Sequence, residues 1–103
     1  MARAAEASFH PEAVAEFDAA ADWYAVRSEQ AADDFVRAVH EAISAIEIRP
    51  SLWVEYLYGT RRYVLRHFPF VIVYLLNESK IMIVAVAHGR RRPGYWKKRI
   101  TRR

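Results

Sequence analysis

Two almost wholly apolar runs near the end of the chain constrain its fold more than any other feature. They cover residues 70–76 and 81–87, and the polar residues 77–80 separate them. Both runs are rich in Val, Ile and Tyr, which favour strands over helices, and turn-forming residues bound them. They therefore predict two paired, buried strands joined by a tight turn. Strands that are apolar on both sides need cover on both faces of their sheet.

The first half of the chain carries two helical patterns. Apolar side chains recur at helical spacing from about Pro11 to Arg27, and a proline suits the first turn of a helix, where a backbone N–H has no partner. Ser28 is a good N-cap for a second helix, which Pro50 ends. Because the link between the helices is very short, we expect an antiparallel pair that packs against one face of the sheet.

Two further segments alternate with the period of a strand. Residues 5–9 predict a short first strand, and residues 61–68 predict a strand with its arginines on one face, which Pro69 ends. The predicted order is β-α-α-β-β-β, an α+β fold in which an N-terminal antiparallel helix pair packs on an antiparallel sheet. We expect one domain over residues 1–103, because no linker or repeat divides the chain. Two helices cover one face of the sheet, so the C-terminal tail, a second copy or a bound partner must cover the other.

Charge is distributed unevenly along the chain. Residues 1–55 contain four Lys or Arg and eleven Asp or Glu, whereas residues 56–103 contain twelve Lys or Arg and one acid. This asymmetry indicates an acidic layer and a basic surface that suits nucleic acid or an acidic protein, unless the two halves simply neutralise each other. The basic residues near the strand ends are the predicted target-binding or nucleic-acid-binding set: Arg61, Arg62, Arg66, Arg90, Arg91, Arg92, Lys97 and Lys98.

Several classes of protein are disfavoured by what the sequence lacks. There is no cysteine, so the chain forms neither a disulfide nor a thiolate metal site, and a reducing cytosol suits it. The N-terminal residues lack the continuous apolar segment of a secretion signal, and no apolar run approaches the roughly 20 residues that span a bilayer. We expect a cytoplasmic protein with no membrane association, no metal and no cofactor.

Two motifs and the order of the elements resemble one family over nearly the whole chain. Residues 68–74 (FPFVIVY) and residues 85–96 (AVAHGRRRPGYW) are similar to the RelE/ParE superfamily of bacterial toxins from type II toxin–antitoxin systems, which act in plasmid stabilisation. The resemblance implies a small α+β fold with two N-terminal helices against an antiparallel sheet. It also implies a cognate antitoxin that wraps the toxin with an extended or helical segment in a hetero-oligomer.

The family has two functional branches. RelE-like members are ribosome-dependent endoribonucleases that cut mRNA, and ParE-like members inhibit DNA gyrase. The nuclease branch commonly places a basic residue on the middle strand of the meander, where this chain has Val71, and residues 88–92 look closer to the ParE-like pattern. The resemblance therefore predicts a ParE-like gyrase inhibitor.

The alternative is a metal-independent mRNA endoribonuclease acting with the ribosome. In that case His88 would carry the proton, and Arg62, Arg90 and Arg92 would hold the phosphate. Tyr95 would stack on a nucleobase. Each of these residues also has a structural interpretation. A histidine at a strand end caps backbone groups, and Tyr95 and Trp96 fold back over apolar sheet surface. The sequence leaves both interpretations open.

Overall fold

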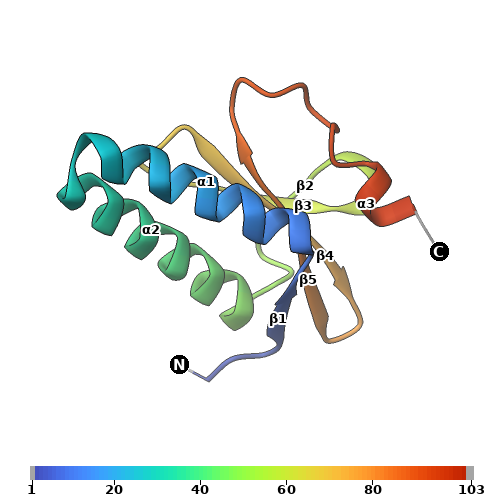
Figure 1. The fold of residues 1–103 in the computed structure, drawn as a ribbon. Helices are drawn as coiled ribbons and strands as arrows, with labels where there is room; N and C mark the ends of the chain where they lie inside the picture. The colour runs from blue at the N-terminus through green and yellow to red at the C-terminus, as the bar shows by residue number, and fades with distance from the viewer. Residues whose placement is uncertain (1, 102–103) are drawn as a thin grey trace.

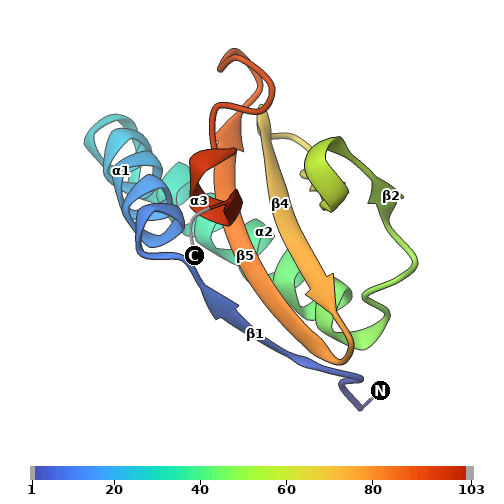
Figure 2. The same cartoon turned by 90° about the vertical axis from the view of Figure 1, so that its right-hand side faces the viewer.

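The computed structural model describes residues 2–101, which form a five-stranded sheet with helices on one face and a C-terminal segment on the other. Figure 1 shows α1 and α2 side by side on one side of the sheet, and Figure 2 shows α3 in front of β5 on the opposite side. We call residues 89–101 the C-terminal tail. The elements are β1 (Glu6–Phe9), α1 (Pro11–Arg27), α2 (Glu29–Ile48), β2 (Val54–Glu55), the 3₁₀ turn η1 (Leu57–Gly59), β3 (Arg61–Val64), β4 (Phe70–Asn77), β5 (Lys80–His88) and α3 (Lys98–Thr101).

Both long helices begin and end at the predicted signals. His10 precedes Pro11, the first residue of α1, and its side chain accepts a hydrogen bond from the Glu12 N–H. At the start of α2, the Ser28 hydroxyl accepts one from the Ala31 N–H at 3.1 Å. Ser28 is the single residue between the helices, so α1 and α2 form the expected antiparallel pair. No helix within residues 2–101 is long and apolar enough to cross a membrane.

The sheet has the order β1-β5-β4-β3-β2, with the two predicted apolar strands β4 and β5 next to each other inside it. The α+β fold class is confirmed, and β3, β4 and β5 form the expected antiparallel meander. β2, which was not predicted, adds a further antiparallel strand beside β3. β1 differs, because it pairs with β5 in parallel, so the complete sheet is mixed. Parallel neighbours need a long connection, and here both helices and three strands lie between them.

An irregularity in β5 determines which side chains face which layer. Val73 pairs with Ala85 but Tyr74 pairs with Ile83, so Val84 is an extra residue on β5. This β-bulge shifts the side-chain alternation by one position. Ile83 therefore faces the helices before the bulge, and Val86 faces them after it.

β3 is shorter than the predicted strand over residues 61–68. It ends at Val64 because the next residue, Leu65, donates its N–H to the Phe70 carbonyl at 3.0 Å and so begins the turn into β4. His67 completes this turn with a positive φ of 66°. The connector before β3, whose shape the sequence did not define, forms β2 and η1.

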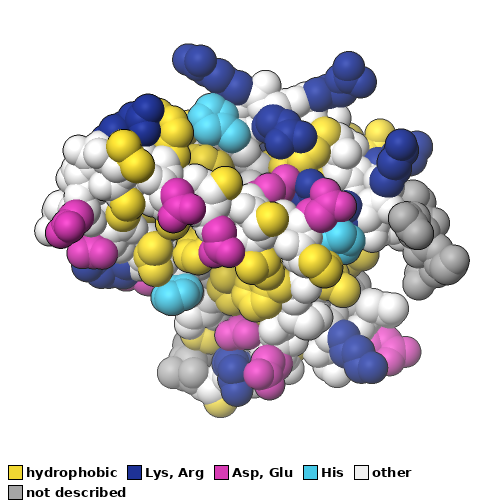
Figure 3. Space-filling view, in the orientation of Figure 1, with side chains coloured by type: hydrophobic (Ala, Val, Ile, Leu, Met, Phe, Trp, Pro, Cys, Tyr) yellow, Lys and Arg dark blue, Asp and Glu magenta, His cyan; other side chains and the backbone are white. Residues whose placement is uncertain are grey.

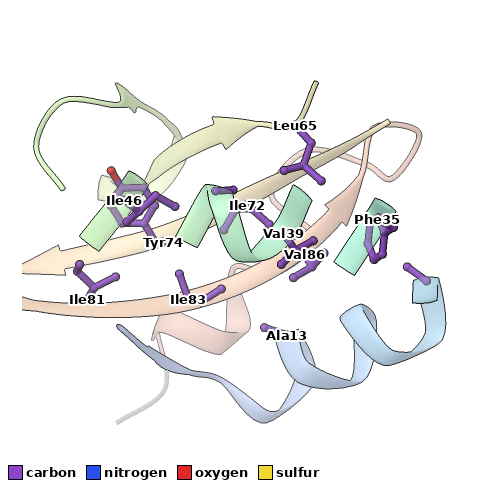
Figure 4. Packing of buried hydrophobic residues seen from close by; sticks show 12 residues of the cluster. Ala13, Phe35, Val39, Ile46, Leu65, Ile72, Tyr74, Ile81, Ile83 and Val86 are labelled. Atoms are coloured by element: carbon purple, nitrogen blue, oxygen red, sulfur yellow. The ribbon is translucent and has the colours of Figure 1, made fainter. Parts of the chain in front are cut away.

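Each face of the sheet has its own hydrophobic core. The helix-side core joins α1 and α2 to the sheet and includes the residues labelled in Figure 4: Ala13, Phe35, Val39, Ile46, Leu65, Ile72, Tyr74, Ile81, Ile83 and Val86. The tail-side core contains Val73, Val84, Ala85, Ala87 and Trp96, with Tyr95 and Ile100 packed against it. Trp96 is 1% exposed, so the C-terminal tail supplies part of the cover that the second face requires.

Candidate functional site

Four exposed arginines lie at the sheet edge where β3 turns into β4 and β5 runs into the tail. The Gly89 N–H donates to the Pro69 carbonyl at 2.8 Å, which joins the two segments. Figure 3 shows Lys and Arg side chains along the upper edge of the molecule, where Figure 1 places the loop after β5. We call this set the cationic edge: Arg66, Arg90, Arg91 and Arg92. None of them forms an ion pair with an acid within residues 2–101.

The other two arginines of the predicted binding set point to opposite faces of the sheet, because they are successive residues of β3. Arg61 lies on the helix side, where it donates to the Trp53 carbonyl at 2.7 Å and pairs with Glu55 at 3.6 Å. Arg62 lies on the tail side, 4.7 Å from the centre of the Tyr56 ring. The predicted binding set is therefore divided between the two faces of the sheet, and Arg61 is already paired.

The two predicted lysines lie in the exposed end of the C-terminal tail. The Lys97 ammonium lies 4.9 Å from the centre of the Tyr58 ring, and Lys98 begins α3. Both side chains are exposed, and neither forms an ion pair with an acid within the described part of the chain. They lie apart from Arg61, on the tail side of the sheet.

A groove of about 420 Å³ lies between α1 and the ends of β4 and β5, next to the cationic edge. We call it the α1 groove. Trp23 projects from α1 at its margin with 53% of its surface exposed. The Arg27 guanidinium stacks on the Trp23 ring at 3.7 Å, which places a positive charge beside the apolar surface. The α1 groove has a mostly apolar lining, formed by Glu16, Ala19, Ala20, Trp23, Tyr24, Pro69, Phe70, Val86, His88 and Arg91.

His88 closes this groove at the end of β5. It pairs with Phe70 across the sheet, and the two rings meet edge to face with centres 5.0 Å apart. The Arg90 N–H donates to His88 Nδ1 at 3.0 Å, so the neutral imidazole carries its proton on Nε2. The structural interpretation of this histidine, a cap on backbone groups at a strand end, is confirmed.

The residues named for RNA cleavage do not converge on one point. His88 faces the helix side of the sheet and Arg62 faces the tail side, because their partners Phe70 and Val73 belong to opposite cores. Arg90 is exposed in the turn, and the Tyr95 hydroxyl is already engaged by Glu16 at 2.6 Å. Within residues 2–101, no group of three or more His, Asp or Glu side chains is arranged to hold a metal ion.

A buried cluster around Glu16 holds the tail against α1. The Glu16 carboxylate accepts four hydrogen bonds: from the Val86 N–H, from the Tyr95 hydroxyl and two from the Arg99 guanidinium, at 2.6–3.0 Å. Arg99 also donates to the Val84 carbonyl at 3.0 Å. The two charged side chains are only 16% and 10% exposed. We call these groups the Glu16 cluster.

The Glu16 cluster takes the place of a missing strand. β1 pairs with β5 only as far as Ile83, so β5 beyond that residue has a free edge with unpaired backbone groups. The Val84 carbonyl and the Val86 N–H are among these groups, and they bond to Arg99 and Glu16 instead. A free edge of this kind would otherwise be open to pairing with another chain.

The cluster also determines the protonation of its members. Burial raises the pKa of Tyr95, and the hydrogen bond to Glu16 and the charge of Glu16 raise it further. Burial alone would lower the pKa of Arg99, but the hydrogen bond and charge of Glu16 raise it overall. Tyr95 therefore remains a protonated donor near neutral pH and is not available as a catalytic base.

The sequence pattern does not single out Glu16 and Arg99 as functional residues. Acids of α1 are expected on its wet face, and Arg99 lies in a run of basic residues that has the composition of a solvated tail. One signal was present: Glu16 is three residues after Ala13 and four before Ala20, both of which are buried. An acid on the buried stripe of a helix requires a partner.

Comparison with known proteins identifies the family. The model of the family described as ParE toxin of type II toxin-antitoxin system, parDE, matches residues 7–93. The chain belongs to the ParE toxin family. A solved structure described as the chromosomal ParDE TA system from P. aeruginosa has the same fold, with a TM-score of 0.72 and 19% sequence identity over 84% of this chain and 98% of the other. No curated protein sequence matches.

The family assignment confirms the resemblance in the sequence and its ParE-like branch. The matched residues end at Pro93, so Tyr95, Trp96 and Arg99 lie beyond them. The Glu16 cluster therefore joins residues within the family match to Tyr95 and Arg99, which lie outside it.

Replacing Glu16 with Gln should release the tail. The change leaves the Arg99 charge buried without its partner, so we expect a loss of about 3 kcal/mol in the free energy of unfolding. Backbone amides of residues 95–100 should also exchange with solvent faster. Urea denaturation and hydrogen exchange measure the two effects.

The matched control is Glu12→Gln. Glu12 lies 3.4 Å from the same guanidinium but its side chain is 67% exposed, so its loss should cost less than about 0.5 kcal/mol. Equal effects of the two substitutions would contradict the assignment of the tail's attachment to Glu16.

Proposed function

We propose that this ParE family toxin acts in the cytoplasm by inhibiting DNA gyrase, and that a cognate antitoxin silences it by binding in the α1 groove. The observation that carries the proposal is the groove itself, an apolar hollow with the half-exposed Trp23 beside Arg27 and Arg91. Neither arginine forms an ion pair with an acid in residues 2–101. The similar P. aeruginosa structure, described as a ParDE system, supports the presence of an antitoxin.

The chemistry of the groove specifies the antitoxin segment. Its apolar lining suits a segment with apolar side chains on one face, and the arginines around it suit carboxylates on the other. Trp23 is the strongest single contact that the groove offers, because a large aromatic ring buries much area on binding. An amphipathic acidic helix or an extended acidic segment meets these requirements.

Two features of the sheet favour gyrase over mRNA as the target. Val71, at the position where the nuclease branch commonly has a basic residue, packs against the tail-side core. The residues that would cut RNA lie on both faces of the sheet, with His88 on the helix side and Arg62 on the tail side. A toxin that acts by protein contact needs no converging catalytic groups.

A supercoiling assay tests the target. The purified chain, added to DNA gyrase with relaxed plasmid and ATP, should block the formation of negatively supercoiled plasmid, and the inhibition should rise with toxin concentration. Adding the product of a neighbouring acidic reading frame should restore supercoiling. Unaffected supercoiling at excess toxin, together with cleavage of ribosome-bound mRNA, would contradict the gyrase proposal.

Replacing Trp23 with Ala tests the antitoxin site. The substitution removes the main apolar contact, so affinity for the same neighbouring protein should fall by about 30-fold, as a loss of roughly 2 kcal/mol implies. Leu52→Ala is the matched control, because Leu52 is 51% exposed, close to the 53% of Trp23, and lies outside the groove. Isothermal titration gives both affinities, and an unchanged value for Trp23→Ala would place the antitoxin elsewhere.

A further inference from the structure

The C-terminal tail covers only part of the second sheet face. Trp96 is buried over β4 and β5, but Val54 on β2 and Val64 on β3 are 62% and 57% exposed. Both valines point to the tail side, because Val54 pairs with Arg62 and Val64 pairs with Val71. Figure 2 shows α3 in front of β5, with β2 at the far side of the sheet. Exposed aliphatic side chains therefore remain on this face.

Aromatic rings hold two cations on the tail side of the sheet. The Arg62 guanidinium lies 4.7 Å from the Tyr56 ring centre, and the Lys97 ammonium lies 4.9 Å from that of Tyr58. Both tyrosine rings contact Trp96, with centres 6.0 Å and 5.8 Å apart. Rings that fix charged side chains in place reduce the entropy lost when a partner binds them. We call the combined surface the β2–β3 face: Val54, Tyr56, Tyr58, Arg62, Val64 and Lys97.

The backbone is strained where it presents Tyr58. This residue has a φ of 60°, in the left-handed region that non-glycine residues rarely adopt, and half of its surface is exposed. Gly94 makes the arrangement possible, because a Cβ at that position would lie 3.0 Å from the Tyr58 ring. In this conformation the half-exposed Tyr58 ring meets Trp96 of the tail edge to face.

The positive charge of the β2–β3 face favours a negatively charged partner. The only acid in residues 56–103 is Glu78, which lies in the turn between β4 and β5. Glu55 of β2 faces the helix side, where it pairs with Arg61. The β2–β3 face thus combines cations with apolar side chains and contains no acid.

We propose that the β2–β3 face is the surface with which this toxin contacts its protein target, a partner that presents carboxylates to Arg62 and Lys97 and apolar side chains to Val54 and Val64. A protein fits better than nucleic acid, because exposed aliphatic groups between cations match an apolar interface centre with a charged rim, whereas phosphate contacts alone leave them unused. The inference rests on the proposed toxin function. It assigns target and antitoxin to opposite faces of the sheet.

Charge and polarity reversal at the face tests this assignment. Arg62→Glu and Val64→Glu alter exposed or half-exposed side chains, so the chain should keep its fold, which thermal unfolding verifies. Both variants should lose growth arrest when expressed without antitoxin, and should need at least about tenfold more protein to inhibit gyrase. Binding of the neighbouring acidic protein should be unchanged. The matched controls are Arg37→Glu on α2 and Val14→Glu on α1, which should behave like the wild type.

The outcomes separate this inference from the proposed function. If the wild-type chain arrests growth without affecting supercoiling, gyrase is the wrong target, and the loss of arrest in the two variants still supports the face as the target surface. If both variants arrest growth as strongly as the wild type, the inference is overturned. It is also overturned if the variants bind gyrase normally but lose binding to a short DNA duplex, because the face then contacts DNA.

Discussion

The structure depends on one buried carboxylate. Burying the Glu16 carboxylate away from water costs free energy that hydrogen-bond donors must offset. Its donors are the Val86 N–H of β5, the Tyr95 hydroxyl of the tail and the guanidinium of Arg99, which is itself buried. Because β1 pairs with β5 only as far as Ile83, one edge of β5 is free beyond that residue, and Glu16 and Arg99 bond to two backbone groups of this edge. One cluster thus bonds to the free edge of β5 and attaches the tail to α1.

The attachment of the tail divides the molecule into two surfaces of different chemistry. On the helix side, the α1 groove lies beside the cationic edge and is lined mainly by apolar side chains. On the tail side, Trp96 covers the centre of the sheet and supports Tyr56 and Tyr58, which hold Arg62 and Lys97. Under the two proposals, the antitoxin would bind the first of these surfaces and the target would bind the second.

The sequence predicted what local patterns determine. The apolar runs specified β4 and β5, Pro11 and Ser28 specified the helix starts, and the need to cover both sheet faces anticipated a role for the tail. It did not predict the pairing of Glu16 with Arg99, which are 83 residues apart. Long-range pairings of this kind leave little trace in the composition of either segment.

A double-mutant cycle between Glu16 and Arg99 tests the central claim most directly. Glu16→Gln, Arg99→Met and the combination are compared by urea denaturation. If the buried pair attaches the tail, the combined variant should be more stable than the sum of the single losses implies, with a coupling free energy of at least about 1.5 kcal/mol. Losses that add to within about 0.5 kcal/mol would mean that the two side chains contribute independently, and would contradict the account.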